Sequence, residues 1–494
     1  MKALMIYPQF PDTSFWKFNH ALKFIGKKAA IPPMGLLTVA AMFPETWEVK
    51  LIDLNVEKLK DEDIIWADYV FISAMILQKE SVCNIIEACH LHDRKIVAGG
   101  PLFTSRPQLF SEIDHLILNE AEVTLPQFLF DLEQGDPKPI YQSSKWADIT
   151  SSPVPRWDLI NQKNYASLSV QYSRGCPYNC DFCDITVLYG NRPRIKTVEA
   201  VLNELEMIYL QGWRGNVFFV DDNFIGNKKQ LKEKLLPAVI VWMKKKKYPF
   251  RFQTQASIDI ASDDLLLDLM IKAGFGAVFV GIETPDEECL AECGKTQNTK
   301  VDLLKSVKKL QSAGMDVQAG FIVGFDSDKT SIFSRMSQFI NESGIVTSMV
   351  GLLNAPPGSK LYKRMVKEKR ITMDATGDNT DLSMNFKPKM DYNVLVNGYK
   401  NIILDIFKPE AYYNRIYKFL HNYRCSSKFD FRRRFTAENV RAIGMAFYKL
   451  GIKSGVRKHF WKLMVWTTFN HPRSIPMAVQ LSIYSYQYRK FYNL

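Results

Sequence analysis

Short apolar runs alternate with segments of helical periodicity along the first 140 residues. None of these runs alternates polar with apolar positions, which is typical of parallel strands that are buried on both faces. The pattern predicts an α/β domain with helices on both sides of a parallel sheet. The apolar runs are residues 3–7, 49–52, 69–74, 95–98 and 115–118, and the helical segments are residues 33–43, 80–90, 102–110 and 125–132.

A second alternating series follows a stretch rich in Ser and Pro, which we interpret as a linker at residues 141–165. Six further strand patterns, each with a helical pattern between it and the next, predict a partial (β/α)6 barrel over residues 166–370. The strands are expected at residues 168–172, 216–220, 250–256, 277–282, 317–323 and 347–353. The helices between them are expected at residues 197–211, 228–247, 263–273, 299–313 and 329–343.

The remaining residues, 371–494, predict a mainly α-helical C-terminal domain. Apolar positions recur at helical spacing in residues 394–407, 410–423, 437–450 and 456–469. We expect these helices to pack as a cap over the mouth of the barrel. The three domains are thus residues 1–140, 166–370 and 371–494, with the linker after the first.

The net charge of the chain is concentrated in the C-terminal domain, so charge affects the interpretation of that domain only. The chain of 494 residues carries a net charge of +12, yet residues 391–494 hold 18 Lys or Arg and 5 Asp or Glu, so the first 390 residues are nearly neutral. A local acidic partner is therefore expected, and a peripheral contact with anionic lipid is one alternative, with Arg432–Arg434 among the cations. Nucleic acid is not expected, because no motif that enters a groove is visible.

Composition also indicates the compartment. Eight cysteines are spread thinly over the chain, which argues against a disulfide scaffold and for a reducing, cytoplasmic setting. No apolar run of about 18 residues is present, so no transmembrane helix is predicted.

Three of the cysteines stand close together, at C-x3-C-x2-C spacing. Cys176, Cys180 and Cys183 follow the first strand pattern of the barrel directly. Thiolates are soft ligands that favour iron–sulfur clusters or zinc. Three thiolates on a cubane cluster would leave one iron open for chemistry. Zinc and a non-catalytic iron–sulfur protein are the alternatives, although no second C-x2-C pair follows and the next histidine is His421.

The cysteine motif, with Phe182 before its last cysteine, resembles that of the radical S-adenosylmethionine (SAM) enzymes. The Ala-Gly-Gly-Pro run at residues 98–101 and the Asn-Glu-Ala-Glu-Val-Thr-Leu run at residues 119–125 resemble motifs of the cobalamin-binding class of that superfamily. The resemblance implies a flavodoxin-like cobalamin-binding domain followed by a radical SAM barrel. It implies three cofactors, namely a [4Fe-4S] cluster, SAM and cobalamin. The D-x-H-x-x-G motif is absent, so no histidine of this domain is expected on cobalt.

Candidate contact residues lie at the carboxyl ends of the expected strands, where ligands of parallel sheets bind. In the first domain the cobalamin candidates are Ser73, Met75, Gly99, Gly100 and Glu120. In the barrel, the resemblance places Asp222 at the SAM amino group, Gln255 and Ser257 against SAM, Glu283 near the ribose and Gly320 beside the adenine. Carboxylates near a cationic sulfonium are favourable.

The three-part layout is similar to the cobalamin-dependent methylases of class B, which include hopanoid methylases. The resemblance implies that the cluster reduces SAM to a 5′-deoxyadenosyl radical and that methylcobalamin supplies a methyl group to an unactivated carbon. We expect a small hydrophobic substrate, for which a hopanoid-like lipid is one candidate, and an external one-electron reductant of the flavodoxin or ferredoxin type. A cobalamin-dependent cyclase or rearrangement enzyme that transfers no methyl group is the alternative.

Overall fold

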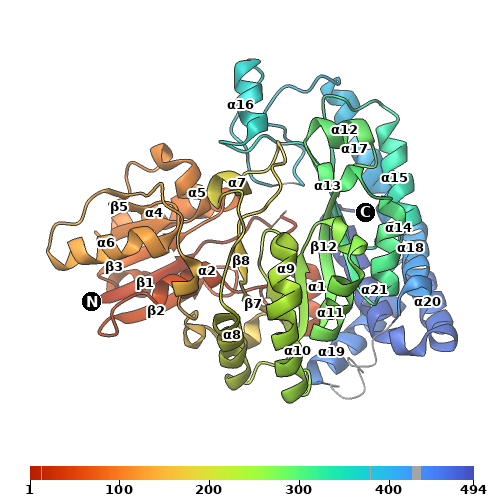
Figure 1. The fold of residues 1–494 in the computed structure, drawn as a ribbon, viewed down its shortest axis with the longest axis horizontal. Helices are drawn as coiled ribbons and strands as arrows, with labels where there is room; N and C mark the ends of the chain where they lie inside the picture. Colours follow the sequence, from red (N-terminus) through yellow and green to blue (C-terminus); the bar gives the residue numbers. More distant parts are fainter. Residues whose placement is uncertain (13, 379, 425–435) are drawn as a thin grey trace.

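The computed structural model describes residues 1–494 except residues 13, 379 and 425–435. Figure 1 shows the first domain at the left, the second sheet with its helices in the middle, and the C-terminal helices at the right. Two parallel sheets and a helical C-terminal region confirm the predicted fold class. The domain boundaries themselves stay predictions. The basic cluster Arg432–Arg434 lies outside the described residues.

The first sheet has six parallel strands in the order β2-β1-β3-β4-β5-β6, which is a flavodoxin-like order with one added edge strand. Its central strands are buried on both faces, as the continuous apolar runs predicted. The strands are β1 Lys2–Tyr7, β2 Glu48–Asp53, β3 Tyr69–Ser73, β4 Lys95–Gly99, β5 His115–Ile117 and β6 Ile140–Tyr141. The helices are α1 Asn19–Ile25, α2 Met34–Ala40, α3 Asp61–Trp66, α4 Lys79–Leu91, α5 Pro101–Ser105 and α6 Ala121–Glu133.

The second sheet also has six parallel strands, in the order β14-β13-β12-β11-β10-β7. Because chain order equals spatial order, each helix crosses to the next strand on one side, as in a partial barrel. The strands are β7 Ser167–Val170, β10 Asn216–Phe219, β11 Arg251–Gln255, β12 Phe275–Glu283, β13 Asp316–Val323 and β14 Ser348–Leu352. The helices are α7 Ile185–Leu188, α8 Val198–Leu210, α9 Lys228–Gln230, α10 Leu236–Lys245, α11 Asp264–Ala273, α12 Glu287–Glu292, α13 Thr296–Thr299, α14 Leu303–Ser312 and α15 Ile332–Ser343.

The segment predicted as a linker is packed between the domains rather than extended in solvent. Trp157 and Tyr165 are each only 2% exposed. The Tyr165 hydroxyl donates a hydrogen bond of 3.0 Å to Asp53, at the end of β2 in the first domain. Ser and Pro therefore exclude regular helix here without excluding order.

The C-terminal helices lie mainly beside the barrel and at its amino end, although Met384 and Leu395 lie against Gly324, beyond β13 at the expected mouth. Helices α17 and α18 pack against α15, and α21 lies against α1, α18 and α20. Residues of α19 and α21 reach the amino ends of the barrel strands, the end opposite the expected mouth. The helices are α16 Lys360–Lys367, α17 Tyr392–Phe407, α18 Pro409–Asn422, α19 Ala437–Ala446, α20 Arg457–Asn470 and α21 Ile475–Phe491. In the part of the chain that the structure describes, no helix combines the length and apolar character needed to cross a bilayer.

Candidate cofactor site

The three cysteines lie on one loop, whose start is held by hydrogen bonds at the carboxyl end of the second sheet. The loop runs between β8 (Ser173–Arg174) and β9 (Arg194–Ile195), which pair in antiparallel fashion at its base. Asp221, after β10, accepts hydrogen bonds from the amide and hydroxyl of Ser173 and, at 3.2 Å, from the Tyr172 amide. Burial raises the pKa of Asp221 to about 7. These contacts anchor the cysteine loop at the carboxyl end of the second sheet.

The loop turns sharply at Gly175, where φ is 89°. A Cβ at this position would lie 2.9 Å from the Gly190 carbonyl oxygen, so there is no room for a side chain. The Gly175 amide donates a hydrogen bond of 2.9 Å to the Asp222 carboxylate. Burial raises the pKa of Asp222 to about 6. Asp222 thus lies at the base of the cysteine loop, and its contact with the SAM amino group stays a prediction.

The surroundings of the three thiols fit an iron–sulfur cluster. Side-chain amides of Asn223 and Gln297 lie 3.9 Å from the sulfurs of Cys176 and Cys180, and hydrogen bonds to sulfur are typical of such clusters. Burial raises the pKa of all three thiols, to about 12 for Cys183, so bound iron would be needed to favour the thiolates. Within the described ranges, no group of three or more His, Cys, Asp or Glu converges as a site for a single metal ion. A cubane instead uses one thiolate per iron.

Of the predicted SAM residues at the end of β11, Ser257 is linked to the cysteine loop through Asn223. Ser257 accepts a hydrogen bond of 3.2 Å from the Asn223 amide and returns one of 3.2 Å through its own backbone N–H. Gln255 lies half-buried at the end of β11. Sequence reasoning gave Asn223 no role of its own, although it stands beside Asp222 at a strand end. The contacts of Gln255 and Ser257 with SAM stay predictions.

Glu283 and Gly320 lie at neighbouring points on adjacent strands. Glu283 has φ of 64°, which turns its carboxylate back over Gly281, the register partner of Gly320. There it forms an ion pair of 2.5 Å with Lys295. Burial would lower the pKa of Lys295, but Glu283 raises it above its ordinary value. The sequence reasoning missed Lys295, and only its position beyond a strand end could have suggested it.

Four of the predicted cobalamin residues lie together at the carboxyl edge of the first sheet. They end β3 and β4 and are Ser73, Met75, Gly99 and Gly100. A Cβ at Gly99 would lie 2.8 Å from the Ile117 carbonyl, and one at Gly100, where φ is 92°, would lie 2.6 Å from the Ser73 hydroxyl. The fold itself therefore requires both glycines, and their contact with a corrinoid stays a prediction.

The fifth predicted cobalamin residue, Glu120, belongs to a group of buried ion pairs between the first domain and the barrel. Its carboxylate accepts hydrogen bonds from Arg174 at 3.0 Å and from Arg194 at 2.8 Å. Glu122 is paired with Arg174 at 2.6 Å. We call these four side chains the arginine–glutamate cluster.

The cluster has a simple origin in local structure. Arg174 and Arg194 are register partners on β8 and β9, on the two sides of the cysteine loop. Glu120 and Glu122 lie at the N-terminus of α6, where the helix dipole also stabilises carboxylates. The arginine–glutamate cluster therefore fixes the first domain against the base of the cysteine loop. In the sequence, the two acidic residues of the Asn-Glu-Ala-Glu run were the only sign of the arginine–glutamate cluster.

We predict that Glu122 makes the folded chain sensitive to acid. Although burial raises it, Arg174 lowers the pKa of Glu122 from 4.5 to about 2. The unfolded chain therefore binds more protons between these values, so the stabilisation is complete above pH 4.5 and is lost as the pH falls through about 2. The pKa shift corresponds to roughly 3 kcal/mol. Urea unfolding of the full chain at several pH values should show this slope in the wild type and a weaker slope in Glu122→Gln.

The control for this experiment is Glu133→Gln, which removes an exposed carboxylate at the end of the same helix. It should leave the slope unchanged. Parallel curves for the wild type and Glu122→Gln would contradict the prediction.

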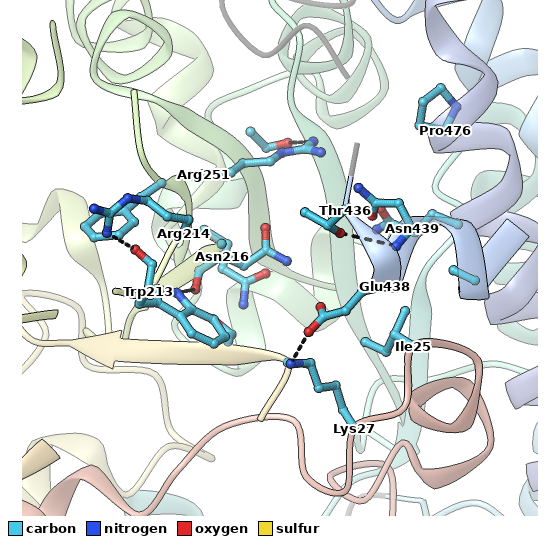
Figure 2. Close-up of a pocket in the computed structure, with 18 of the residues that line it drawn as sticks. Ile25, Lys27, Trp213, Arg214, Asn216, Arg251, Thr436, Glu438, Asn439 and Pro476 are labelled. Atoms are coloured by element: carbon cyan, nitrogen blue, oxygen red, sulfur yellow. Dashed lines mark hydrogen bonds and ion pairs between the residues drawn. The ribbon is translucent and has the colours of Figure 1, made fainter. Parts of the chain in front are cut away.

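A large cavity of about 2350 Å³ lies at the other end of the barrel. Figure 2 shows Asn216 and Arg251, at the amino ends of β10 and β11, on one side of it and the ion pair between Lys27 and Glu438, 2.6 Å long, on the other. None of the predicted cofactor residues lines this cavity. It is therefore separate from the cofactor site.

Comparison with known proteins agrees with this architecture. A family model for the radical SAM superfamily matches residues 170–335, and one for a B12 binding domain matches residues 28–129. A third, for a domain of unknown function (DUF4070), matches residues 359–494. These matches confirm the predicted radical SAM core and cobalamin-type first domain.

Two solved structures share the fold at 15% identity. The radical SAM methyltransferase TsrM from Kitasatospora setae, solved with cobalamin and a [4Fe-4S] cluster, has a TM-score of 0.63 over 90% of this chain and 99% of its own. The cobalamin-dependent radical enzyme OxsB, solved with aqua-cobalamin, has a TM-score of 0.62 over 99% of this chain and 79% of its own.

Two relatives are similar over nearly the whole chain. An uncharacterized methyltransferase of Synechocystis sp. is 41% identical over 470 residues, which cover 93% of this chain and 86% of the relative. The hopanoid C-2 methylase of Rhodopseudomonas palustris is 33% identical over 472 residues, which cover 93% of this chain and 88% of that enzyme. With the two matching domain models, these relatives show that the chain belongs to the family of cobalamin-dependent radical SAM methylases.

Proposed function

We propose that this protein transfers a methyl group to an unactivated carbon of a small hydrophobic molecule. The observation that carries the proposal is the arginine–glutamate cluster. It fastens the domain with the predicted cobalamin residues to the base of the loop with the three cysteines. A methyl donor and a radical generator must both reach one substrate carbon, and a fixed contact between their domains serves that need.

The substrate class that we infer is a hopanoid-like lipid. The support is the identity of 33% to a hopanoid C-2 methylase, spread over 93% of this chain. A bacteriochlorophyllide d C-12(1)-methyltransferase of Chlorobaculum tepidum is less similar, at 22% identity.

The side chains have distinct roles in this proposal. When bound, the cluster and SAM would supply a 5′-deoxyadenosyl radical, and cobalamin would supply the methyl group. Cys176, Cys180 and Cys183 would hold the cluster, and Asp221 keeps their loop in place. Glu283 and Lys295 form an ion pair over Gly281, the register partner of Gly320, and would place a neutral pair of charges beside bound SAM.

We also propose that an external one-electron reductant, of the flavodoxin or ferredoxin type, reduces the cluster in the cytoplasm. A peripheral contact between the basic C-terminal domain and a membrane belongs to the same proposal, because a hopanoid-like substrate is dissolved in lipid.

A labelled-methyl experiment tests the proposed function. The full chain, purified anaerobically with iron, sulfide and hydroxocobalamin, is incubated with a reductant, a hopanoid hydrocarbon and SAM that carries a trideuterated methyl group. We expect a hopanoid with one trideuteromethyl group, together with one 5′-deoxyadenosine and one S-adenosylhomocysteine per product. The measurement is mass spectrometry of the lipid and nucleoside fractions.

Omission of cobalamin is the control, and it should stop methylation. A product with no added carbon, formed along with 5′-deoxyadenosine, would contradict methyl transfer and favour a cyclase or rearrangement enzyme. Product formation without 5′-deoxyadenosine would contradict the radical route.

A further inference from the structure

Helix α20 carries exposed apolar side chains on the face opposite the one that packs against the protein. Phe460, Leu463 and Met464 are buried in the core. On the other side Trp461, Val465 and Phe469 are 43%, 55% and 83% exposed. Their spacing of four residues places these three side chains on one face of the helix. Lys458 and Lys462 lie in the same stripe as Val465 and Phe469, so this face mixes cationic with apolar side chains, and its apolar members stay exposed.

The exposed face continues onto the preceding π-helix, Phe447–Lys453. Tyr448 and Ile452 of that helix are 46% and 62% exposed. The Trp461 indole joins the two segments, because it donates a hydrogen bond of 2.9 Å to the Gly451 carbonyl and packs directly on that glycine. We call Tyr448, Ile452, Trp461, Val465 and Phe469 the α20 patch.

The segment of chain that carries the α20 patch holds charges of one sign. Residues 439–494 contain nine Lys or Arg and no Asp or Glu. Lys458 and Lys462 are exposed on α20 itself, and Lys453 lies with its ammonium 4.7 Å from the centre of the Tyr448 ring. Long cationic side chains can lie along apolar surface and extend their charge to its rim.

We propose that the α20 patch binds the interfacial layer of an anionic lipid bilayer. Exposed aromatic and aliphatic side chains beside lysines combine burial of apolar surface in a bilayer with attraction to its anionic headgroups. Trp461 and Tyr448 suit the headgroup region, while Val465, Ile452 and Phe469 suit the acyl boundary. The lysines and arginines complement anionic headgroups. An acidic soluble protein would complement the charge, but it would leave so exposed an apolar face uncompensated.

The purpose of this surface rests on the proposed function, whereas the binding itself does not. A lipid-like substrate is dissolved in the bilayer, so an enzyme held at the membrane surface meets it at high local concentration. The patch lies on the C-terminal helices and includes none of the predicted cofactor residues.

Vesicle sedimentation of the reconstituted full chain tests the proposal. We expect binding to vesicles of mixed phosphatidylcholine and phosphatidylglycerol, weaker binding as salt is raised, and weak binding to phosphatidylcholine alone. Phe469→Asp, which places a charge at the most exposed apolar position of the patch, should lower partitioning at least about tenfold.

Phe130→Asp is the matched control. Phe130 is 58% exposed on α6, and its replacement makes the same change of side chain and charge far along the chain from the patch. This variant should bind vesicles like the wild type. The proposal would be overturned if Phe469→Asp bound vesicles as well as the wild type, or if the wild type did not bind anionic vesicles. It would also be overturned if Phe469→Asp still bound vesicles but no longer bound an acidic reductant protein that the wild type binds saturably.

A second measurement separates this proposal from the proposed function. With substrate dispersed in detergent, Phe469→Asp should methylate at the wild-type rate, while with substrate in anionic vesicles it should be slower. Normal vesicle binding without any methylation would contradict the proposed function and leave the surface proposal standing.

Discussion

Replacement of Cys180 by alanine is expected to reduce SAM cleavage to the background level. Cys180 is the most buried of the three cysteines, at 8% exposed, and the Gln297 amide lies 3.9 Å from its sulfur. Loss of one thiolate leaves two ligands on one loop, which is too few to hold a cubane with a single open iron. The measurements are iron and sulfide content, the electron paramagnetic resonance signal of the reduced cluster, and 5′-deoxyadenosine formed from SAM.

Cys293→Ala is the matched control for this loss. Cys293 is also buried, at 3% exposed, and it contacts the same loop through a hydrogen bond of 2.9 Å from the Asp181 amide to its carbonyl. That bond uses only the backbone, so the variant should keep the cluster and the cleavage of SAM. Wild-type 5′-deoxyadenosine formation by Cys180→Ala would overturn the assignment of the cysteine loop.

Replacement of Arg174 by methionine is expected to loosen the first domain from the barrel. The Arg174 side chain is 14% exposed, and its partners Glu120 and Glu122 are 2% and 9% exposed. Removal of one member of a buried ion pair leaves an uncompensated charge and costs about 3–5 kcal/mol. The midpoint of urea unfolding should fall, and proteolysis between the domains should become faster. Methyl transfer should fall more than SAM cleavage, because only methyl transfer needs the first domain held in a fixed position relative to the barrel.

Two further variants make this result specific. Arg156→Met removes an arginine from an ion pair with Asp158 whose side chains are 42% and 55% exposed, and it should cost less than about 1 kcal/mol. Glu122→Gln added to Arg174→Met should recover part of the loss, because it removes a buried charge. An effect of Arg174→Met no larger than that of Arg156→Met would show that the arginine–glutamate cluster does not hold the domains together.

The convergence of the candidate cofactor residues could be predicted because it depends on neighbours in the sequence. Cys176, Cys180 and Cys183 lie on one short loop, and the carboxyl ends of parallel strands meet at one edge of a sheet whatever surrounds them. Asp222 accordingly accepts a hydrogen bond from the loop and Ser257 bonds to the neighbouring Asn223, while their contacts with SAM stay predictions. Lys295 could not be predicted as the partner of Glu283, because their ion pair depends on how the chain turns after β12.

Glu120 shows the same limit from another side. Its place at the end of β5 suggested a ligand contact, but its partners Arg174 and Arg194 lie 54 and 74 residues further along the chain. Only the docking of one domain on another brings such residues together. Whether Glu120 also contacts a corrinoid stays a prediction.

The sequence by itself determined the two parallel sheets and the cysteine loop, because each leaves its pattern within a single segment: a continuous apolar run for a strand buried on both faces, helical spacing for a helix buried on one, and a fixed spacing for the cysteines. Helix α21 left no such trace. Its buried residues, among them Met477, Leu481 and Tyr488, lie on several sides, because α1, α18 and α20 surround it. The tertiary structure alone decided that helix, the end of the barrel that the C-terminal helices cover, and the ion pairs that join the domains. Each depends on contacts between distant segments, and these arise only when the separately patterned elements pack together.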